Sequence, residues 1–426
     1  MRKAALGTVP AAGQAEHRKK AVMQFNRYIE NITPSKSMQM SMLAKELKKA
    51  DPEILDLSIG EPDFDTPRKV VDEAIKWLNA GFTHYTTGPG LPELREGIAK
   101  KLNEENGCHY DPAGIIVCPS GKNSIFLACA TLLNTGDEAV VLAPYWVSYP
   151  SIIESLGAVP VTLELKPENR YAILEEELRK VVSDRTRMII INYPNNPTGM
   201  VLTENDLQAL KNVMLDYPEI TLLSDEMYEM ILFDGKKNVS PAADPEIADR
   251  VITSNGFSKS AAMTGWRIGY IASTPEFVKV AGKFFGHTVT QTCGFIQKAA
   301  VVALTCKEEM EMMRASYEKR RNLFVDGMNQ IPGVNAMMPD GAFYAWVNFD
   351  MELIKKMPGY EPGKGEYSSI VSEWLLRSAK VSSVPGIAYG VTGSTFVRFC
   401  FAVSEEALTK AVSQIRSAVC AIGGGV

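Results

Sequence analysis

The sequence predicts an α/β protein whose larger part is a mostly parallel β-sheet covered by helices. Short apolar runs rich in β-branched residues alternate with helical patterns from about residue 70 to residue 325. Unusual polar residues follow these runs instead of lying scattered between them. The chain has 426 residues, 46% of them hydrophobic and 22% charged, which is enough to bury a large core.

The predicted elements of the larger part follow one another along the chain. The strand candidates are GIIVC (114–118), EAVVLA (138–143), AVPVTL (158–163), RMIIIN (187–192), ITLLSD (220–225), RVITSN (250–255) and WRIGYIA (266–272). Helical patterns lie between them, such as SIFLACATLL (124–133) and ENDLQALKNVMLDY (204–217). This alternation is what predicts the parallel sheet.

Both chain ends are predicted to form a second, smaller domain. Residues 24–71 and 326–426 mix helical patterns with a few strand candidates, FYAWVNF (343–349) and STFVRFCFA (394–402). The large domain would then span residues 72–325. Residues 1–22 are basic and alanine-rich without the apolar core of a secretory signal, so we interpret them as a disordered leader.

Composition argues against several classes of function. The formal net charge of −5 disfavours a nucleic-acid-binding protein. The four histidines and seven cysteines lack metal-ligand spacing, and no CxxC pair occurs. Scattered cysteines suggest reduced thiols in the cytoplasm. No apolar run reaches the roughly 18–20 residues of a membrane helix.

Five polar loops follow the strand candidates at their carboxyl ends. GIIVC leads into PSGKNS, EAVVLA into PYWVSY, RMIIIN into YPNNPTG and RVITSN into GFSKS, while ITLLSD ends in Asp225. Ligands of open parallel sheets bind outside the carboxyl ends of the strands. We therefore expect these loops to surround a single crevice.

The loop Ser120–Gly121–Lys122 joins a strand to a helix. Backbone N–H groups at such a helix start, together with the helix dipole, favour an anion such as phosphate. The loop lacks the GxxxxGK[ST] pattern, and no well-placed GxGxxG occurs, so a nucleotide site is disfavoured. A plain tight turn is the alternative.

The stretch SNGFSKSAAMTGWRIGY (254–270) carries Lys259 and Arg267 and no acidic residue. Either a carboxylate from elsewhere pairs with them or they await an anionic ligand. A lysine acts as a covalent catalyst when its amine is uncharged, and cationic neighbours lower its pKa. An ordinary surface lysine is the alternative, but the apolar flanks indicate packed structure.

Asp225 ends an apolar strand, where a carboxylate is unfavourable unless it is paired. It could cap a following helix. It could also hold a protonated ring nitrogen, as in enzymes that use pyridoxal phosphate. Tyr228 would share its face if the chain turned helical, and Asn196 lies in a turn fixed by two prolines and a glycine.

Five motifs together give the chain a family resemblance. The chain resembles the class I aminotransferases, which depend on pyridoxal 5′-phosphate, and within that family it looks most like the bacterial aspartate enzymes. The motifs that carry the resemblance are GEPDFDTP, HYTTGPGLPELR, NYPNNPTG, SDEMYE and FSKSAAMTGWRIGY, followed by VRFCFA. The resemblance covers nearly the whole chain from about Pro34. It implies fold type I, with a mostly parallel seven-stranded sheet between helices and a smaller α+β domain, and an obligate homodimer.

The resemblance also implies roles for single residues. Lys259 would form the Schiff base with the cofactor, Asp225 would hold the pyridine nitrogen, and Tyr228 and Asn196 would bond the ring hydroxyl. Trp146 would stack on the ring. The phosphate would lie against Ser120, Gly121, Lys122, Ser258 and Arg267, and Tyr85 would reach the phosphate of the partner subunit. Arg398, with Gly60 and Asn196, would bind the substrate α-carboxylate.

The side chain of the substrate is harder to infer. Lys122 matches a lysine that holds a distal carboxylate, which favours aspartate with 2-oxoglutarate, although Lys122 could instead support only the phosphate. Ser35 and Ser37 lie where the N-terminal segment should close over the substrate, and Phe343 is expected to line the pocket. Lys36, Met38 and the segment 287–295 depart from the aspartate pattern, which leaves prephenate, aromatic and alanine-type substrates open.

Two other classes of function remain as alternatives. A lyase or a cyclopropane-forming synthase would keep every cofactor residue and would differ only in its products. A ligand-binding regulator would need an added DNA-binding module, and no basic helix-turn-helix segment occurs.

Overall fold

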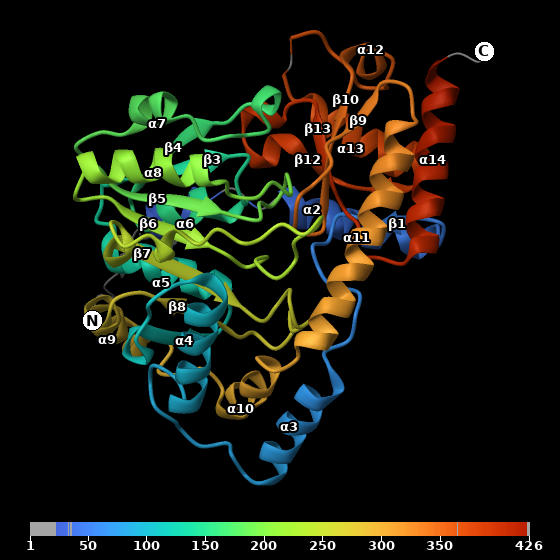
Figure 1. The fold of residues 1–426 in the computed structure, drawn as a ribbon. Helices are drawn as coiled ribbons and strands as arrows, with labels where there is room; N and C mark the ends of the chain where they lie inside the picture. Colours follow the sequence, from blue (N-terminus) through green and yellow to red (C-terminus); the bar gives the residue numbers. More distant parts are fainter. Residues whose placement is uncertain (1–22, 33, 35, 364, 424–426) are drawn as a thin grey trace, which may run out of the picture.

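The computed structural model describes residues 23–32, 34, 36–363 and 365–423. Its main feature is a seven-stranded sheet, seen in the left half of Figure 1. In spatial order the strands are β2 (Ile115–Cys118), β8 (Gly269–Ala272), β7 (Val251–Gly256), β6 (Thr221–Asp225), β5 (Thr186–Asn192), β3 (Glu138–Ala143) and β4 (Val159–Glu164). Only β8 runs antiparallel to its neighbours. The mostly parallel sheet predicted from the sequence is confirmed.

Alternate residues of each strand enter different hydrophobic cores. In β3, Val140 and Leu142 belong to one buried cluster, whereas Ala139 and Val141 belong to another. The first core packs under α4 (Pro92–Asn106), α7 (Glu175–Val181), α8 (Glu204–Asp216) and α10 (Gly294–Ala303). The second packs under α5 (Gly121–Leu132), α6 (Ser148–Ser155) and α9 (Pro275–Thr288). Helices therefore cover both faces of the sheet.

The C-terminal part holds a four-stranded antiparallel sheet, seen at the upper right of Figure 1. Its order is β12 (Val384–Pro385), β13 (Phe396–Cys400), β10 (Tyr344–Phe349) and β9 (Val334–Ala336). Helices α12 (Met351–Ile354), α13 (Tyr367–Trp374) and α14 (Glu405–Gly423) accompany it. The predicted strands at 343–349 and 394–402 correspond to β10 and β13.

The two ends of the chain meet in space. Strand β1 (Leu55–Asp56) pairs in parallel with β11 (Val381–Ser382), and α2 (Lys36–Ala50) packs against β11 and β12. The shorter helix α1 (Arg27–Glu30) instead contacts α6.

The predicted boundary between residues 325 and 326 falls inside α11 (Lys307–Asn329), the long helix in Figure 1 that connects the two parts. Near its start, α10 packs against α3 (Arg68–Asn79). The division at residues 24–71, 72–325 and 326–426 stays a prediction, and the leader predicted for residues 1–22 lies outside the described residues.

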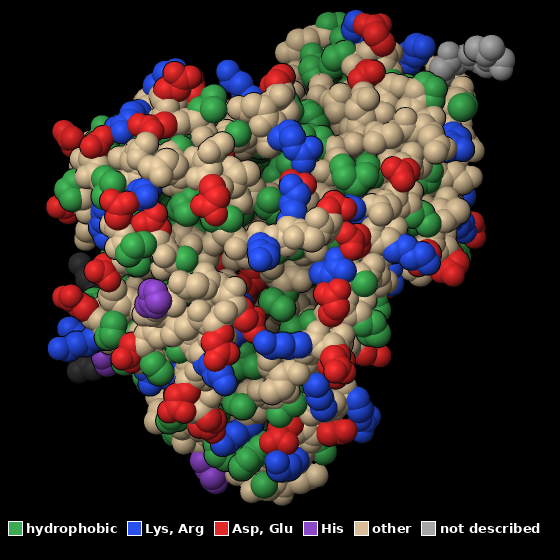
Figure 2. Space-filling view, viewed as in Figure 1, with side chains coloured by type: hydrophobic (Ala, Val, Ile, Leu, Met, Phe, Trp, Pro, Cys, Tyr) green, Lys and Arg blue, Asp and Glu red, His purple; other side chains and the backbone are tan. Residues whose placement is uncertain are grey.

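The surface carries charges of both signs. Figure 2 shows lysine and arginine side chains interspersed with aspartate and glutamate over the face in view. Within the described residues, no helix combines the length and apolar character that crossing a membrane requires.

Candidate active site

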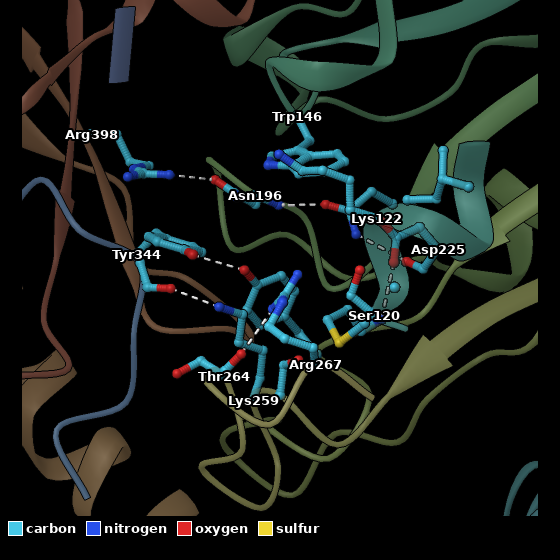
Figure 3. A pocket seen from close by; sticks show the side chains of 17 residues that line it. Ser120, Lys122, Trp146, Asn196, Asp225, Lys259, Thr264, Arg267, Tyr344 and Arg398 are labelled. Carbon is cyan, nitrogen blue, oxygen red and sulfur yellow. Dashed lines mark hydrogen bonds between the residues drawn. The ribbon is translucent and has the colours of Figure 1, made fainter. Parts of the chain in front are cut away.

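A cavity of about 270 Å³ opens at the edge of the large sheet where the polar loops meet (Figure 3). All strands of this sheet except β8 place their carboxyl ends on that edge, and the reversed β8 begins there. The C-terminal sheet closes the opposite side with Tyr344 and Arg398. The single crevice expected from the five loops is therefore present.

The cavity brings together every residue predicted to bind the cofactor or the α-carboxylate, except Tyr85. Its lining includes Gly60, Ser120, Gly121, Lys122, Trp146, Asn196, Asp225, Tyr228, Ser258, Lys259, Arg267 and Arg398. Tyr85 lies outside, with 86% of its surface exposed. Ile125, Asn192, Met227, Thr264 and Tyr344 also line the cavity and were not predicted.

The turn into α5 is tightly packed. Ser120 has a φ of 108°, a region that favours glycine, and its hydroxyl accepts a hydrogen bond from the Asn123 N–H at 3.3 Å. A Cβ at Gly121 would lie 2.3 Å from the Met227 methyl, and one at Gly269 would lie 2.6 Å from the Gly121 nitrogen. The first turn of α5 therefore faces the cavity with backbone N–H groups and no bulky side chain at its start.

Lys259 enters the cavity from the loop after β7. Its amine donates a hydrogen bond to the Gly60 carbonyl at 2.7 Å. Burial is the main cause that lowers the pKa of Lys259 to about 8. The nearby Cys400 and Glu61 act to raise it, and the charges of Arg398 and Arg267 act to lower it. The cationic neighbours that the sequence predicts as the cause are a smaller cause than burial.

Asp225 is the acidic residue of the lining and is only 6% exposed. The buried Tyr149 hydroxyl donates to its Oδ2 at 2.6 Å, and the Met227 N–H donates to Oδ1 at 3.3 Å. Burial raises the pKa of Asp225 to about 6, although the hydrogen bond from Tyr149 opposes this shift. A turn follows Asp225 and no helix, so the helix-cap alternative is wrong.

Arg398 is held from two sides. Its Nη1 donates to the Asn196 side-chain oxygen at 2.9 Å, and its Nη2 donates to the Ser58 carbonyl at 2.6 Å. The guanidinium carbon lies 4.4 Å from the centroid of the Tyr344 ring. Arg398 is only 4% exposed, yet its Nε is buried without a hydrogen-bond partner.

Asn192, at the end of β5, holds the backbone beside Asp225 and Asn196 in place through its side-chain amide. Its side-chain nitrogen donates to the Asp225 carbonyl at 2.9 Å, and its oxygen accepts from the Asn196 N–H at 2.9 Å. One buried amide therefore fixes both the Asp225 end of β6 and the turn that carries Asn196.

Two tyrosines share the floor of the cavity. The Tyr228 and Tyr344 hydroxyls lie 2.7 Å apart and are hydrogen-bonded. A Cβ at Gly60 would lie 2.1 Å from the Tyr344 hydroxyl, so only glycine fits there. The prediction that Phe343 lines the cavity is wrong. Phe343 is buried against Tyr228 and Tyr317, and the next residue of the chain faces the cavity instead.

The lining is rich in positive charge. Lys122, Lys259, Arg267 and Arg398 face the cavity, and among the described residues none of them forms an ion pair. Burial and the charge of Arg267 lower the pKa of Lys122. Its amine lies 4.9 Å from the centroid of the Trp146 ring. In the part of the chain that the structure describes, no carboxylate from elsewhere forms an ion pair with Lys259 or Arg267, which favours the expectation of an anionic ligand.

Comparison with known proteins identifies the family. Residues 52–415 match the family model described as aminotransferase class I and II. The chain is 38% identical over 395 residues to the aspartate aminotransferase of Geobacillus stearothermophilus, covering 92% of this chain and 98% of that one. The chain belongs to the class I and II aminotransferases. The resemblance stated from the motifs is confirmed.

Other relatives agree with this aminotransferase assignment. The aspartate/prephenate aminotransferase of Cereibacter sphaeroides is 35% identical over 391 residues, which cover 91% of this chain and 97% of that one. The crystal structure of the aspartate aminotransferase from Rhizobium meliloti superposes with a TM-score of 0.88 at 34% identity, over 93% of this chain and 99% of that one. The Thermus thermophilus aspartate aminotransferase with maleate gives 0.85 at 35% identity, over 93% and 100%.

Proposed function

We propose that this aminotransferase binds pyridoxal 5′-phosphate in the cavity and moves the amino group of L-aspartate to 2-oxoglutarate. The observation that carries the proposal is the placement of the Lys259 amine, with its lowered pKa, in one cavity with the buried Asp225 carboxyl and the buried Arg398 guanidinium. Such chemistry requires three groups: a lysine that bonds covalently to the cofactor, an acid that pairs with the ring nitrogen, and a cation that binds the substrate carboxylate.

The donor set fits the cofactor. Lys122, Arg267, Ser120, Ser258 and the N–H groups at the Gly121 turn offer cations and donors for a phosphate without a neutralising acid among the described residues.

The remaining groups suit the ring. Among the described residues, the Asp225 Oδ1 receives a single hydrogen bond, of 3.3 Å, which leaves capacity for a ring N–H. We assign Asn196 and Tyr228 to the ring hydroxyl and Trp146 to the ring face.

The residues of the chain would then divide the work. When bound, pyridoxal phosphate supplies a protonated pyridine ring that accepts electron density released at the substrate α-carbon. Asp225 is ionised above its pKa of about 6 and keeps the ring nitrogen protonated. Near pH 8 roughly half of the Lys259 amines are uncharged, so the amine is able to take the proton from the α-carbon.

Two cations would select the substrate. The planar fork of Arg398, which lines the cavity, suits the α-carboxylate. Lys122, whose amine lies 4.9 Å from the centroid of the Trp146 ring, would hold the distal carboxylate of aspartate. Relatives named aspartate aminotransferase and aspartate/prephenate aminotransferase support a dicarboxylic substrate, and they make prephenate the second candidate amino acceptor.

The assembly and location of the enzyme follow from the same resemblance. We propose a homodimer in which Tyr85, exposed in the single chain, reaches the phosphate bound by the partner subunit. The cytoplasmic location expected from the scattered cysteines stays a prediction.

The test is a half-reaction panel. The protein is purified with the cofactor, single amino acids are added, and the absorbance of the bound cofactor is followed. Aspartate and glutamate should change the spectrum fastest. A faster change with aromatic or neutral amino acids would refute the assignment of aspartate, and release of ammonia without need of a second 2-oxo acid would indicate a lyase.

A second experiment tests the covalent role of Lys259. After borohydride reduction, the intact mass of the wild-type chain should rise by one cofactor, whereas Lys259→Ala should bind the cofactor without this gain. Full turnover by Lys259→Ala would refute the mechanism.

A further inference from the structure

A buried polar cluster lies behind the turn that carries Asp225 and Tyr228. Two other residues of this turn, Glu226 and Glu229, are 1% and 7% exposed and do not line the cavity. The proposed chemistry does not use them. Buried carboxylates are unfavourable unless they are paired and hydrogen-bonded, so their position in this turn requires an explanation.

Glu229 connects the turn to two other elements. It forms an ion pair with Lys101 of α4 and accepts a hydrogen bond from Asn106, the last residue of the same helix. It also accepts a hydrogen bond of 2.6 Å from the Asn255 side chain in β7. A single carboxylate is therefore fastened to a helix on one side and to a central strand on the other.

Asn255 passes this connection on to the loop of the proposed catalytic lysine. Its side-chain oxygen accepts a hydrogen bond of 2.6 Å from the N–H of Gly256. Ser258 and Lys259 follow within three residues. A side-chain path from the Asp225 turn to the Lys259 loop thus runs through Glu229 and Asn255, both buried, in addition to the backbone pairing of Asp225 with Ser254 between β6 and β7.

Glu226 fixes the other end of the turn. Its carboxylate accepts hydrogen bonds from Ser240 at 2.8 Å, Ser224 at 3.0 Å and Asn238 at 3.0 Å, and its N–H donates to the Ser254 carbonyl at 2.9 Å. Glu226 also accepts a long hydrogen bond of 3.4 Å from Asn106, which bonds Glu229 as well. Its bonds with Ser224, Ser240 and Asn238 do not involve Glu229, so loss of Glu229 would loosen one attachment of the turn and leave these three in place.

We propose that Glu229, acting through Asn255, is a positioning residue that sets the Asp225 turn against the Lys259 loop. This inference rests on the proposed function, because it concerns the two residues assigned to the ring nitrogen and to the covalent link. Displacements well below the size of an atom matter in such a site, and a misplacement of about 1 Å can lower a rate by about 100-fold.

The experiment compares Glu229→Gln and Asn255→Ala with a matched control, Glu105→Gln. Glu105 also pairs with Lys101, at 3.9 Å, and with Lys307 at 2.6 Å, but among the described residues it has no hydrogen bond or ion pair to the turn. Each protein is assayed for affinity of the cofactor-free form for pyridoxal phosphate, for the pH midpoint of the bound cofactor's absorbance, for kcat and KM with aspartate, and for melting temperature.

We expect Glu229→Gln and Asn255→Ala to lower kcat by about 10- to 100-fold with KM nearly unchanged, to weaken cofactor binding and to shift the pH midpoint. Glu105→Gln should match the wild type. A lowered melting temperature with unchanged kcat and pH midpoint in both variants would overturn the proposal in favour of a purely structural role.

Four outcomes separate the possible failures. A wild-type protein that does not bind the cofactor refutes the proposed function, whereas variants that match Glu105→Gln refute only this inference. If Glu229→Gln does not fold, Asn255→Ala tests the proposal alone, because that variant keeps the ion pair between Glu229 and Lys101. Failure of both to fold also assigns the cluster to stability alone.

Discussion

Tyr149 offers the sharpest test of how the site controls its ring-nitrogen partner. The buried hydroxyl donates a hydrogen bond of 2.6 Å to Asp225, and this bond favours the ionised carboxylate against the effect of burial. Tyr149→Phe removes the donor and keeps the ring, which packs edge-on against Trp146 at 5.3 Å. The substitution therefore isolates a single hydrogen bond.

The size of the effect follows from the energy of that bond. A hydrogen bond to a charged group contributes about 1.5–3 kcal/mol, and one pKa unit corresponds to about 1.4 kcal/mol. Removing the bond should raise the pKa of Asp225 from about 6 to about 7–8. If binding requires the ionised carboxylate, cofactor affinity at pH 6 should fall roughly 5- to 50-fold, with little change near pH 9.

The assay is fluorescence titration of the cofactor-free protein with pyridoxal phosphate between pH 5.5 and 9. Tyr145→Phe is the matched control, because Tyr145 lies four residues earlier and its hydroxyl has no hydrogen bond to Asp225. A ratio of variant to wild-type affinity that is constant over the whole pH range would refute the reasoning, even if Tyr149→Phe bound the cofactor more weakly.

Three further substitutions test the charges of the cavity. The pKa of Asp225 is raised from 3.8 unfolded to about 6 folded, so its contribution to stability is present at acid pH and is lost as the pH rises through 6. Asp225→Asn should therefore raise the free energy of unfolding of the cofactor-free protein by up to about 3 kcal/mol at pH 8 but not at pH 3, as measured by urea titration. The variant should also lose transamination activity. Equal stability changes at both pH values would contradict this. Lys122→Ala should lower kcat/KM about 10- to 100-fold more for aspartate than for alanine, and equal losses would remove Lys122 from side-chain selection. Arg398→Lys should lower kcat/KM about 10- to 100-fold for both amino acids, mainly through KM, because one amine cannot replace the two-pronged fork; an effect on aspartate alone would show that Arg398 does not hold the α-carboxylate.

The sequence was most informative about the edge of the sheet. Asn196, Asp225 and Lys259 each follow or end a strand, and parallel strands deliver their carboxyl ends to the same edge. Alternation of β-branched runs with helices was therefore enough to predict both the sheet and the meeting of its loops.

The supporting residues could not be predicted in the same way. Tyr149 lies on a helix and Asn192 within a strand, and no local pattern says that their side chains face Asp225. The sequence predicts that Phe343 lines the cavity, whereas its neighbour Tyr344 does. Successive residues of a strand point to opposite faces, so an error of one residue exchanges the two faces. The register of β10 is fixed by its pairing with β13, which the local sequence does not reveal. Tyr85 stays untested, since its proposed contact belongs to a second chain.

Arg398 has a consequence for the coherence of the whole chain. Its guanidinium touches the turn of Asn196 and the Ser58 carbonyl while its own backbone belongs to β13, so one side chain ties together three stretches that are far apart in sequence. A carboxylate bound there would tighten all three at once. Amide hydrogen exchange of residues 55–58 should therefore slow when a dicarboxylate such as maleate binds, although these amides take no part in the chemistry. The exchange rate of these N-terminal amides would therefore report whether a carboxylate is bound at Arg398, without any turnover.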